Sequence, residues 1–189
     1  MTSYENLIQL SEFFESCLGN PLEDNSPVNF QQILLADEQE RLASSPIEFI
    51  KQWGYLDYTV PRYLGGKLSS LDELYTLTRL LARRDITMAI MFGLAFFTAL
   101  PIWIAGNSKQ KKHLSESLRQ GKIGALALTE EEHGTDLTSN KMNAKPTEDG
   151  WEISGRKWCV NFATLSEYAV VLCRTNEKGG LLGFSLFYI

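Results

Sequence analysis

The feature that most constrains the fold is an apolar segment over residues 86–105, which contains no charged side chain. A segment of this length either crosses a bilayer as a helix or forms the central helix of a helical domain, apolar on all sides. Basic residues flank it on both sides, at Arg84 before it and Lys109 after it, so neither membrane orientation is favoured. We therefore expect a buried central helix without membrane contact, and we keep a membrane-associated helical protein as the alternative.

Helical patterns surround this segment. Apolar residues at helical spacing predict a helix over residues 3–18, which Gly19 ends. Ser70 and Glu73 have the spacing of a capping box at the start of another helix. Residues 55–66 contain a proline and a glycine pair and are expected to form a structured loop. The remaining predicted helices cover residues 29–42, 45–54, 70–84 and 108–120.

After Gly121 the pattern changes to short alternating segments separated by turn residues, which is typical of β-strands. The predicted strands cover residues 123–128, 141–146, 151–154, 157–160, 168–175 and 182–189, with turns at 148–150 and 178–180. The predicted fold class is α+β, with an all-α helical domain over 1–121 followed by an incomplete antiparallel β-barrel-like domain over 122–189. Because an open sheet has an unprotected edge, we expect either more chain after Ile189 or another element to cover it.

Composition excludes several classes of function. The net charge of −5 argues against a nucleic-acid surface, because phosphate binding needs a basic face. Cys17, Cys159 and Cys173 are far apart and form no CxxC pair, so we expect neither a zinc site nor a disulfide framework. With only two histidines, a metal site is not expected either. The cysteine pattern favours a reducing, cytoplasmic location, and the first residues do not resemble a secretory signal.

The stretch most suited to ligand binding covers residues 123–136. An apolar run long enough for a buried strand ends in Thr129, three glutamates, His133, Gly134 and Thr135. A strand that ends in a hydroxyl, a glycine and a second hydroxyl presents backbone N–H groups and side-chain donors at one edge. These groups suit a polar, anionic ligand.

The same stretch resembles the signature of the acyl-CoA dehydrogenase flavoprotein family, in which a strand runs into Leu-Thr-Glu and then Gly-Ser-Asp. Other segments resemble the family in the same order along the chain. They are the Gly54–Tyr55 and Gly65–Gly66 region, LLARRD at 80–85, GNSKQKKHLSESL at 106–118, DGWEISGRKW at 149–158, VVLCRT at 170–175 and GFSLF at 183–187. The resemblance therefore implies the family's helical N-terminal domain and the first part of its middle β domain.

The resemblance also implies an activity, namely FAD-dependent α,β-dehydrogenation of an acyl thioester on CoA or on a carrier protein. It implies a homo-oligomer and a place in fatty acid metabolism. Leu128 and Thr129 would touch the flavin ring, Gly134 would allow close approach, and Thr135 would contact the pyrophosphate or the acyl-CoA substrate. The implied FAD contacts are Leu126, Leu128, Thr129, Gly134, Thr135, Trp158, Val160 and Asn161.

The chain departs from the family pattern in the segment that faces the flavin. Cys159 stands where an aromatic residue is usual, Asn161 where a hydroxyl is usual, and Trp158 lies one residue early. Thr129 and Thr135 also fit ordinary strand-end and turn positions, and Trp158 also fits a core position. The two cysteines of this half, Cys159 and Cys173, are expected to be small buried hydrophobic residues.

The family's C-terminal helical domain, which supplies the catalytic glutamate, has no counterpart in residues 1–189. The catalytic residue is therefore unassigned. Glu130 matches a structural glutamate of the family, and the two glutamates after it are expected to lie in a solvated turn. The alternative function is a catalytically inactive relative that acts as a binding or assembly partner, completed by a separate chain that bears the C-terminal domain.

Overall fold

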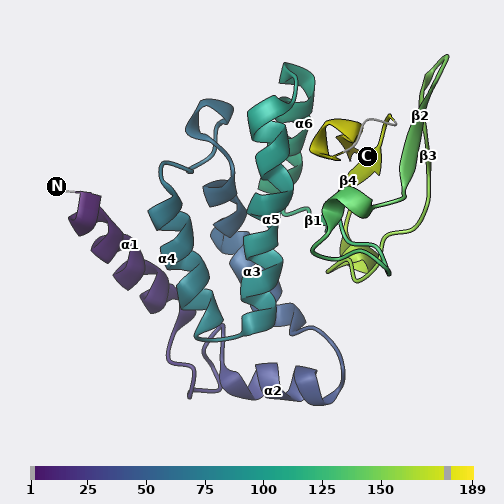
Figure 1. Ribbon diagram of the computed structural model, residues 1–189. Helices are drawn as coiled ribbons and strands as arrows, with labels where there is room; N and C mark the ends of the chain where they lie inside the picture. Colours follow the sequence, from purple (N-terminus) through teal and green to yellow (C-terminus); the bar gives the residue numbers. More distant parts are fainter. Residues whose placement is uncertain (1–2, 177–179) are drawn as a thin grey trace.

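The computed structural model describes residues 3–176 and 180–189 (Figure 1). The helices are α1 (Ser3–Leu18), α2 (Phe30–Glu38), α3 (Ser44–Trp53), α4 (Leu71–Ala82), α5 (Ile86–Ala105) and α6 (Ser108–Arg119). The predicted helices are thus confirmed, and the predicted loop over 55–66 contains two short 3₁₀ helices, η1 (Tyr55–Thr59) and η2 (Arg62–Leu64). The predicted turn at 178–180 lies largely outside the described residues.

Local caps explain where several helices begin and end. Ser70 accepts a hydrogen bond from the Glu73 N–H and starts α4, as its spacing predicted. Gly54 ends α3 in the left-handed conformation that favours glycine. The second predicted helix ends at Glu38 rather than near residue 42, because Glu40 takes a positive φ of 51° that is incompatible with a continuing helix.

The sheet contains β1 (Gly124–Ala127), β2 (Asn143–Thr147), β3 (Gly150–Ser154), β4 (Tyr168–Arg174) and β5 (Phe184–Tyr188). Short 3₁₀ helices η3 (Leu137–Ser139), η4 (Ala163–Leu165) and η5 (Gly180–Gly183) lie in the connections. The α+β class is confirmed, and the five strands form one sheet that does not close into a barrel. Figure 1 shows this sheet beside α5 and α6.

The sheet is mixed rather than antiparallel throughout. β4 pairs with β1 in parallel and with β5 antiparallel, and β2 and β3 form an antiparallel hairpin. Beyond the end of β1, Asn143 of β2 pairs in parallel with Arg174 of β4. The chain between β1 and β4 carries the β2–β3 hairpin and returns so that β4 runs in the same direction as β1. Alternation in sequence shows which residues share a face, but it does not report strand direction.

The predicted strand over 157–160 is wrong. These residues form an irregular turn in which Cys159 has a positive φ of 52°, a conformation outside the extended region that strand pairing requires. The same turn leaves Cys159 exposed, whereas Cys173 in β4 is buried as expected. The expectation that both cysteines are buried is therefore half right.

Helices and sheet share one hydrophobic core, whose centre is α5. Phe92 of α5 packs against Tyr55 of η1, with ring centroids 5.2 Å apart, and the same cluster contains Ile123, Tyr168 and Val170 from the sheet region. α5 is long and apolar enough to cross a membrane, but 56% of its most apolar stretch is buried inside the protein, as expected for a core helix. One core includes residues from both sides of residue 121, so the core does not mark a boundary between two domains there. The predicted domain boundary at residue 121 stays a prediction.

Gly124 provides a test of this junction. It lies opposite Tyr168 in the β1–β4 register, and a Cβ atom at this position would lie 2.1 Å from Tyr168 Cε2. We expect Gly124→Ala to lower the free energy of unfolding by about 2 kcal/mol, because a packed ring must move. Urea denaturation at neutral pH measures the change.

The matched control is Gly93→Ala in the middle of α5. A Cβ atom there would lie 3.5 Å from Thr78 Cγ2, which is an ordinary contact. Alanine also favours a helix over glycine, so this variant should be more stable than the wild type by roughly 0.5–1 kcal/mol. Equal effects of the two substitutions would contradict the close packing of β1 on Tyr168.

Candidate functional site

The candidate site lies where β1 ends. Leu128 and Thr129 follow the last residue of β1, and the carbonyl of Thr129 accepts a hydrogen bond of 2.9 Å from the Trp158 N–H. This contact joins the two stretches that the sequence singles out, 126–135 and 158–161. The indole of Trp158 is 46% exposed, so it is a surface group beside Thr129 and not a core residue.

The other predicted contacts are distributed around this junction. Leu126 in β1 lies opposite Val170 and packs partly buried against the main core. Val160 packs partly buried against a second, smaller cluster in the sheet. Gly134, Thr135 and Asn161 are exposed. Within residues 3–176 and 180–189, no hydrogen bond joins Gly134 or Thr135 to the segment 158–161.

A tight turn follows Thr129. The N–H of Glu130 donates to the His133 carbonyl at 3.0 Å, and the His133 N–H donates back to the Glu130 carbonyl at 3.1 Å. Beyond it, the Asp136 carboxylate accepts hydrogen bonds from the Thr138 and Ser139 hydroxyls, which lower the pKa of Asp136. The loop is therefore shaped by its own bonds, and Gly134 and Thr135 lie on its surface between these two anchors.

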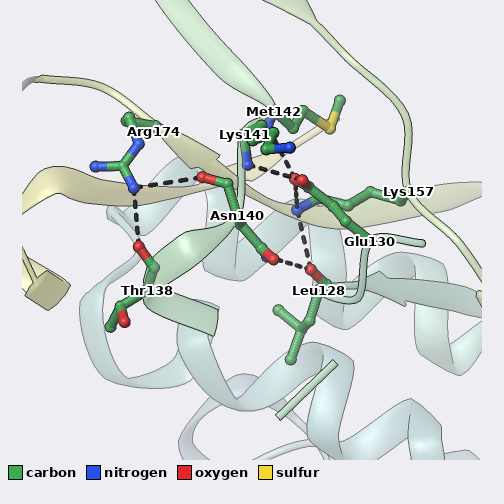
Figure 2. Close-up of polar contacts among 8 residues, drawn as sticks. All are labelled: Leu128, Glu130, Thr138, Asn140, Lys141, Met142, Lys157 and Arg174. Carbon is green, nitrogen blue, oxygen red and sulfur yellow. Dashed lines mark hydrogen bonds and ion pairs between the residues drawn. The ribbon is translucent and has the colours of Figure 1, made fainter. Parts of the chain in front are cut away.

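Glu130 is buried at the centre of a polar cluster (Figure 2). One of its oxygens accepts from the Lys141 N–H at 2.7 Å; the other accepts from the Met142 N–H at 2.8 Å and from Lys157 Nζ at 3.0 Å. The Lys157 side chain is 6% exposed and that of Glu130 is 9% exposed, so both charges are largely removed from water. We refer to Glu130, Lys157 and Asn140 as the Glu130 cluster.

The environment of Glu130 decides its charge. Burial by itself raises the pKa of this carboxyl, but the hydrogen bonds from Lys141, Met142 and Lys157, with the charge of Lys157, outweigh it and hold the pKa below its usual value. Glu130 is thus an ionised structural carboxylate, as the family resemblance implied. The next two glutamates are exposed, in agreement with the expected solvated turn.

Sequence reasoning did not identify Asn140 or Lys157. Asn140 is fully buried, and its Nδ2 donates to the Leu128 carbonyl at 2.6 Å; Lys157 Nζ donates to the same oxygen at 2.9 Å (Figure 2). Asn140 lies in a polar loop and carries no sequence signal of burial. Lys157 lies within the motif at 149–158, and a lysine between turn residues is normally solvated.

Of the predicted contacts, Gly134, Thr135, Trp158 and Asn161 lie on an exposed surface. A groove of about 340 Å³ beside the Glu130 cluster is lined by Lys141, Ser154 and Arg156 among others, and a groove of about 540 Å³ separates the end of α5 from β4 and β5. Neither is lined by the predicted FAD contacts. Within the described residues, no group of three or more His, Cys, Asp or Glu side chains is placed to hold a metal ion.

Replacing Glu130 tests the buried ion pair. Glu130→Gln leaves the Lys157 charge buried without its partner, so the free energy of unfolding at pH 7 should fall by about 3 kcal/mol. Because folding lowers the pKa of Glu130, its stabilising effect is present above the ordinary value of 4.5 and is lost as the pH falls below it. The difference between wild type and variant should therefore shrink between pH 5 and pH 3 (roughly the titration range) in urea denaturation.

Glu131→Gln is the control for this substitution, since Glu131 is the exposed neighbour in the same turn. Its effect on the free energy of unfolding should stay within about 0.5 kcal/mol at every pH. A loss in Glu130→Gln that is no larger than this, or that grows on acidification, would contradict the structural role of Glu130.

Comparison with known proteins agrees with the fold. The family model described as the acyl-CoA dehydrogenase middle domain matches residues 125–189. The L-prolyl-[peptidyl-carrier protein] dehydrogenase of a Serratia species is 27% identical over 186 residues, which cover 95% of this chain and 46% of that protein. The chain thus spans less than half the length of this curated relative.

Two solved structures resemble the whole chain. Butyryl-CoA dehydrogenase from Megasphaera elsdenii has a TM-score of 0.80 at 20% identity. The match includes 100% of this chain and 49% of the Megasphaera chain. The FAD complex of PigA has a TM-score of 0.81 at 22% identity, with 100% and 48% of the chains covered. Residues 125–189 thus resemble the acyl-CoA dehydrogenase middle domain, and the whole chain shares its fold with about half of each of these two solved proteins.

Proposed function

We propose that this chain forms the flavin-contacting part of an acyl-CoA dehydrogenase-like flavoprotein, whose reaction is the FAD-dependent α,β-dehydrogenation of an acyl thioester. The Serratia relative acts on a substrate bound to a carrier protein, and the Megasphaera enzyme is named for an acyl-CoA. These relatives support a thioester substrate on CoA or on a carrier protein. The PigA structure contains FAD, which supports this cofactor.

The observation that carries the proposal is the junction of Thr129 with Trp158. The backbone bond brings Trp158, an exposed aromatic residue, next to Thr129, a residue with a hydroxyl at the end of an apolar strand. A flavin needs an apolar or aromatic surface for its ring and hydrogen-bond donors for its polar edge and its pyrophosphate. Leu128, Thr129, Trp158 and Asn161 would hold the ring, and Thr135 would hold the pyrophosphate or the substrate.

Gly134 supports close approach of a ligand to this loop. It does not take a positive φ, and a Cβ atom at this position would meet nothing within 4 Å. The chain's own conformation and packing therefore do not require glycine here. Leu126 and Val160 lie partly buried beneath the surface, and we propose that they support the ring from below.

Bound FAD would accept a hydride from the substrate, and the reaction also needs a base for the proton α to the thioester carbonyl. Glu130 is unsuited to this role, because its carboxylate is engaged by three donors in a buried cluster. We propose that the base comes from a segment outside residues 1–189, in the same polypeptide or in a partner. We also propose a homo-oligomer, a cytoplasmic location and a role in fatty acid metabolism.

Titration with FAD tests the proposed cofactor. Wild-type protein should quench flavin fluorescence and gain a visible flavin spectrum. Thr135→Ala should weaken FAD binding about fivefold, because one hydrogen bond to the ligand is lost, whereas Thr135→Ser keeps the hydroxyl and should bind as the wild type does. Gly134→Ala should bind about tenfold more weakly, because its methyl group meets the ligand.

Circular dichroism provides the control for these variants. Both residues that change in these three variants, Gly134 and Thr135, are exposed, so the free energy of unfolding should vary by less than about 0.5 kcal/mol. Protein that takes up no FAD at any concentration would overturn the proposed cofactor, and equal affinities of Thr135→Ala and Thr135→Ser would remove Thr135 from the site.

A second candidate function, as a catalytically inactive binding or assembly partner, is favoured by one surface of α5. Four apolar side chains are exposed at spacings of four and seven residues, which places them on one side of the helix. They are Ile86, Ile90, Phe97 and Ile104, with exposed fractions of 62%, 42%, 58% and 73%. Since the chain spans 46% of its Serratia relative, we propose that this face binds an apolar helix from outside residues 1–189.

Without that helix, the exposed face should cause self-association that increases with concentration, because contiguous apolar surface is unfavourable in water. Phe97→Glu should shift the protein toward the monomer in sedimentation-velocity experiments. Tyr63→Glu changes an equally prominent side chain, 71% exposed on η2, and should leave self-association unchanged. A wild-type protein that stays monomeric throughout would contradict this second function.

A further inference from the structure

The carbonyl of Leu128 is bound in an unusual way for a residue at the end of a strand. It accepts two side-chain hydrogen bonds, from Asn140 Nδ2 at 2.6 Å and from Lys157 Nζ at 2.9 Å. Both donors come from segments far along the chain, and both side chains are buried. Figure 2 shows them converging on the same oxygen. The two acceptor sites of this carbonyl are therefore occupied.

These bonds fix more than one atom. A trans peptide is planar, with its C=O and N–H pointing in opposite directions. Since the Leu128 carbonyl points into the Glu130 cluster, the N–H of Thr129 points away from it. The next carbonyl, that of Thr129, is in turn held by the Trp158 N–H. The orientation of both peptide groups at the candidate site is thus set by contacts from outside the strand.

The donors are themselves held in place. Lys157 Nζ also binds a Glu130 oxygen at 3.0 Å, and the Glu130 carboxylate is anchored by two backbone N–H groups of the segment that follows Asn140. Lys157 has few alternative orientations, because its charge would be buried without a partner in any of them. Asn140 is anchored through its own backbone, whose carbonyl accepts from Arg174 Nη2 at 3.4 Å.

The choice of asparagine at position 140 is not explained by stability. Its Nδ2 is used, but its Oδ1 has no hydrogen-bond partner among the described residues although the side chain is fully buried. A leucine of similar size would remove this unpartnered acceptor. Asparagine therefore provides a donor to the Leu128 carbonyl but leaves its own buried Oδ1 without a partner among the described residues. This combination indicates that Asn140 serves to orient the Leu128 peptide rather than to stabilise the fold.

We propose that Asn140 and Lys157 are positioning residues, which orient the Leu128–Thr129 peptide so that the Thr129 N–H and hydroxyl meet the polar edge of the flavin. This inference rests on the proposed function, because it assigns the flavin to this surface. Neither residue touches the ligand in this arrangement. They act through the backbone, with the Glu130 carboxylate as the fixed base of the cluster.

Asn140→Leu is the first test, because it removes one donor and the unpartnered acceptor together. Unfolding by urea should show a stability close to that of the wild type. The backbone order parameter of Thr129 in flavin-free protein should fall from about 0.85 to about 0.6, because the peptide is less restrained. The order parameter of Val171, in the middle of β4, should not change. The dissociation constant for FAD should rise about tenfold, equivalent to about 1.4 kcal/mol.

Lys157→Met with Lys141→Met as a matched control is the second test. Both substitutions replace a lysine by an apolar chain of similar length, but the Lys141 side chain is exposed and pairs with Glu132. Lys157→Met should lower the Thr129 order parameter and weaken FAD binding about tenfold. Lys141→Met should change neither. Equal behaviour of the two variants would overturn the role of Lys157.

The outcomes separate this inference from the proposed function. Wild-type protein that binds no FAD overturns both. Wild-type protein that binds FAD, together with an Asn140→Leu variant that keeps the affinity and the Thr129 order parameter, overturns the positioning role alone. A variant that loses stability and affinity in parallel, with Thr129 and Val171 loosened equally, would also overturn it, because the cluster would then be purely structural.

Discussion

The burial of α5 is the constraint on which the rest of the structure depends. This helix is apolar on nearly all sides, so in water it must be covered on several sides at once. Helix α4 and η1 cover part of it, and β1 covers another part. Each large side chain that becomes fully buried, such as Phe92 or Met88, contributes about 2 kcal/mol. The sheet is therefore not an independent addition to the helices, because its first strand completes their core.

The position of the candidate site follows from that packing. The contact with α5 orients β1, and Leu128 marks the point where the strand leaves the apolar core. Polar backbone groups must find partners at this boundary. Here the partners are the buried side chains of Asn140 and Lys157, and the charge of Lys157 is balanced by Glu130. Buried ion pairs contribute little to stability compared with apolar packing, and in some proteins they serve to fix the geometry of the groups around them. The cluster therefore suits a function that depends on orientation.

Two apolar residues that remain exposed after this packing also bear on function. Trp158 is exposed next to Thr129, and Phe97 is exposed on the face of α5 that also carries Ile86, Ile90 and Ile104. A contiguous apolar patch on a protein surface often marks contact with a ligand or another chain. We propose a flat aromatic ligand with polar edges for the first of these surfaces and an apolar helix for the second. Both agree with a chain that represents less than half the length of its relatives.

Much of the fold follows from local sequence. The cap at Ser70, the glycine stop at Gly54 and the charge-free segment that becomes α5 are local signals, and the helices they predict are present. The strand predicted at 157–160 is absent: Cys159 has a positive φ, and the neighbouring Trp158 N–H bonds to Thr129, which is distant in sequence. Local alternation contains no information about such contacts.

At the candidate site, too, some features follow from local sequence and others only from tertiary contacts. Sequence by itself determined the helices, the strands other than the one predicted at 157–160, the family resemblance and the residues expected at the flavin, because these depend on spacing along the chain. Only the tertiary structure decided that β1 and β4 run parallel, that Trp158 lies at the surface beside Thr129, and that Asn140 and Lys157 are buried against the Leu128 carbonyl. Burial and hydrogen-bond partners depend on segments that meet only after the core around α5 has formed.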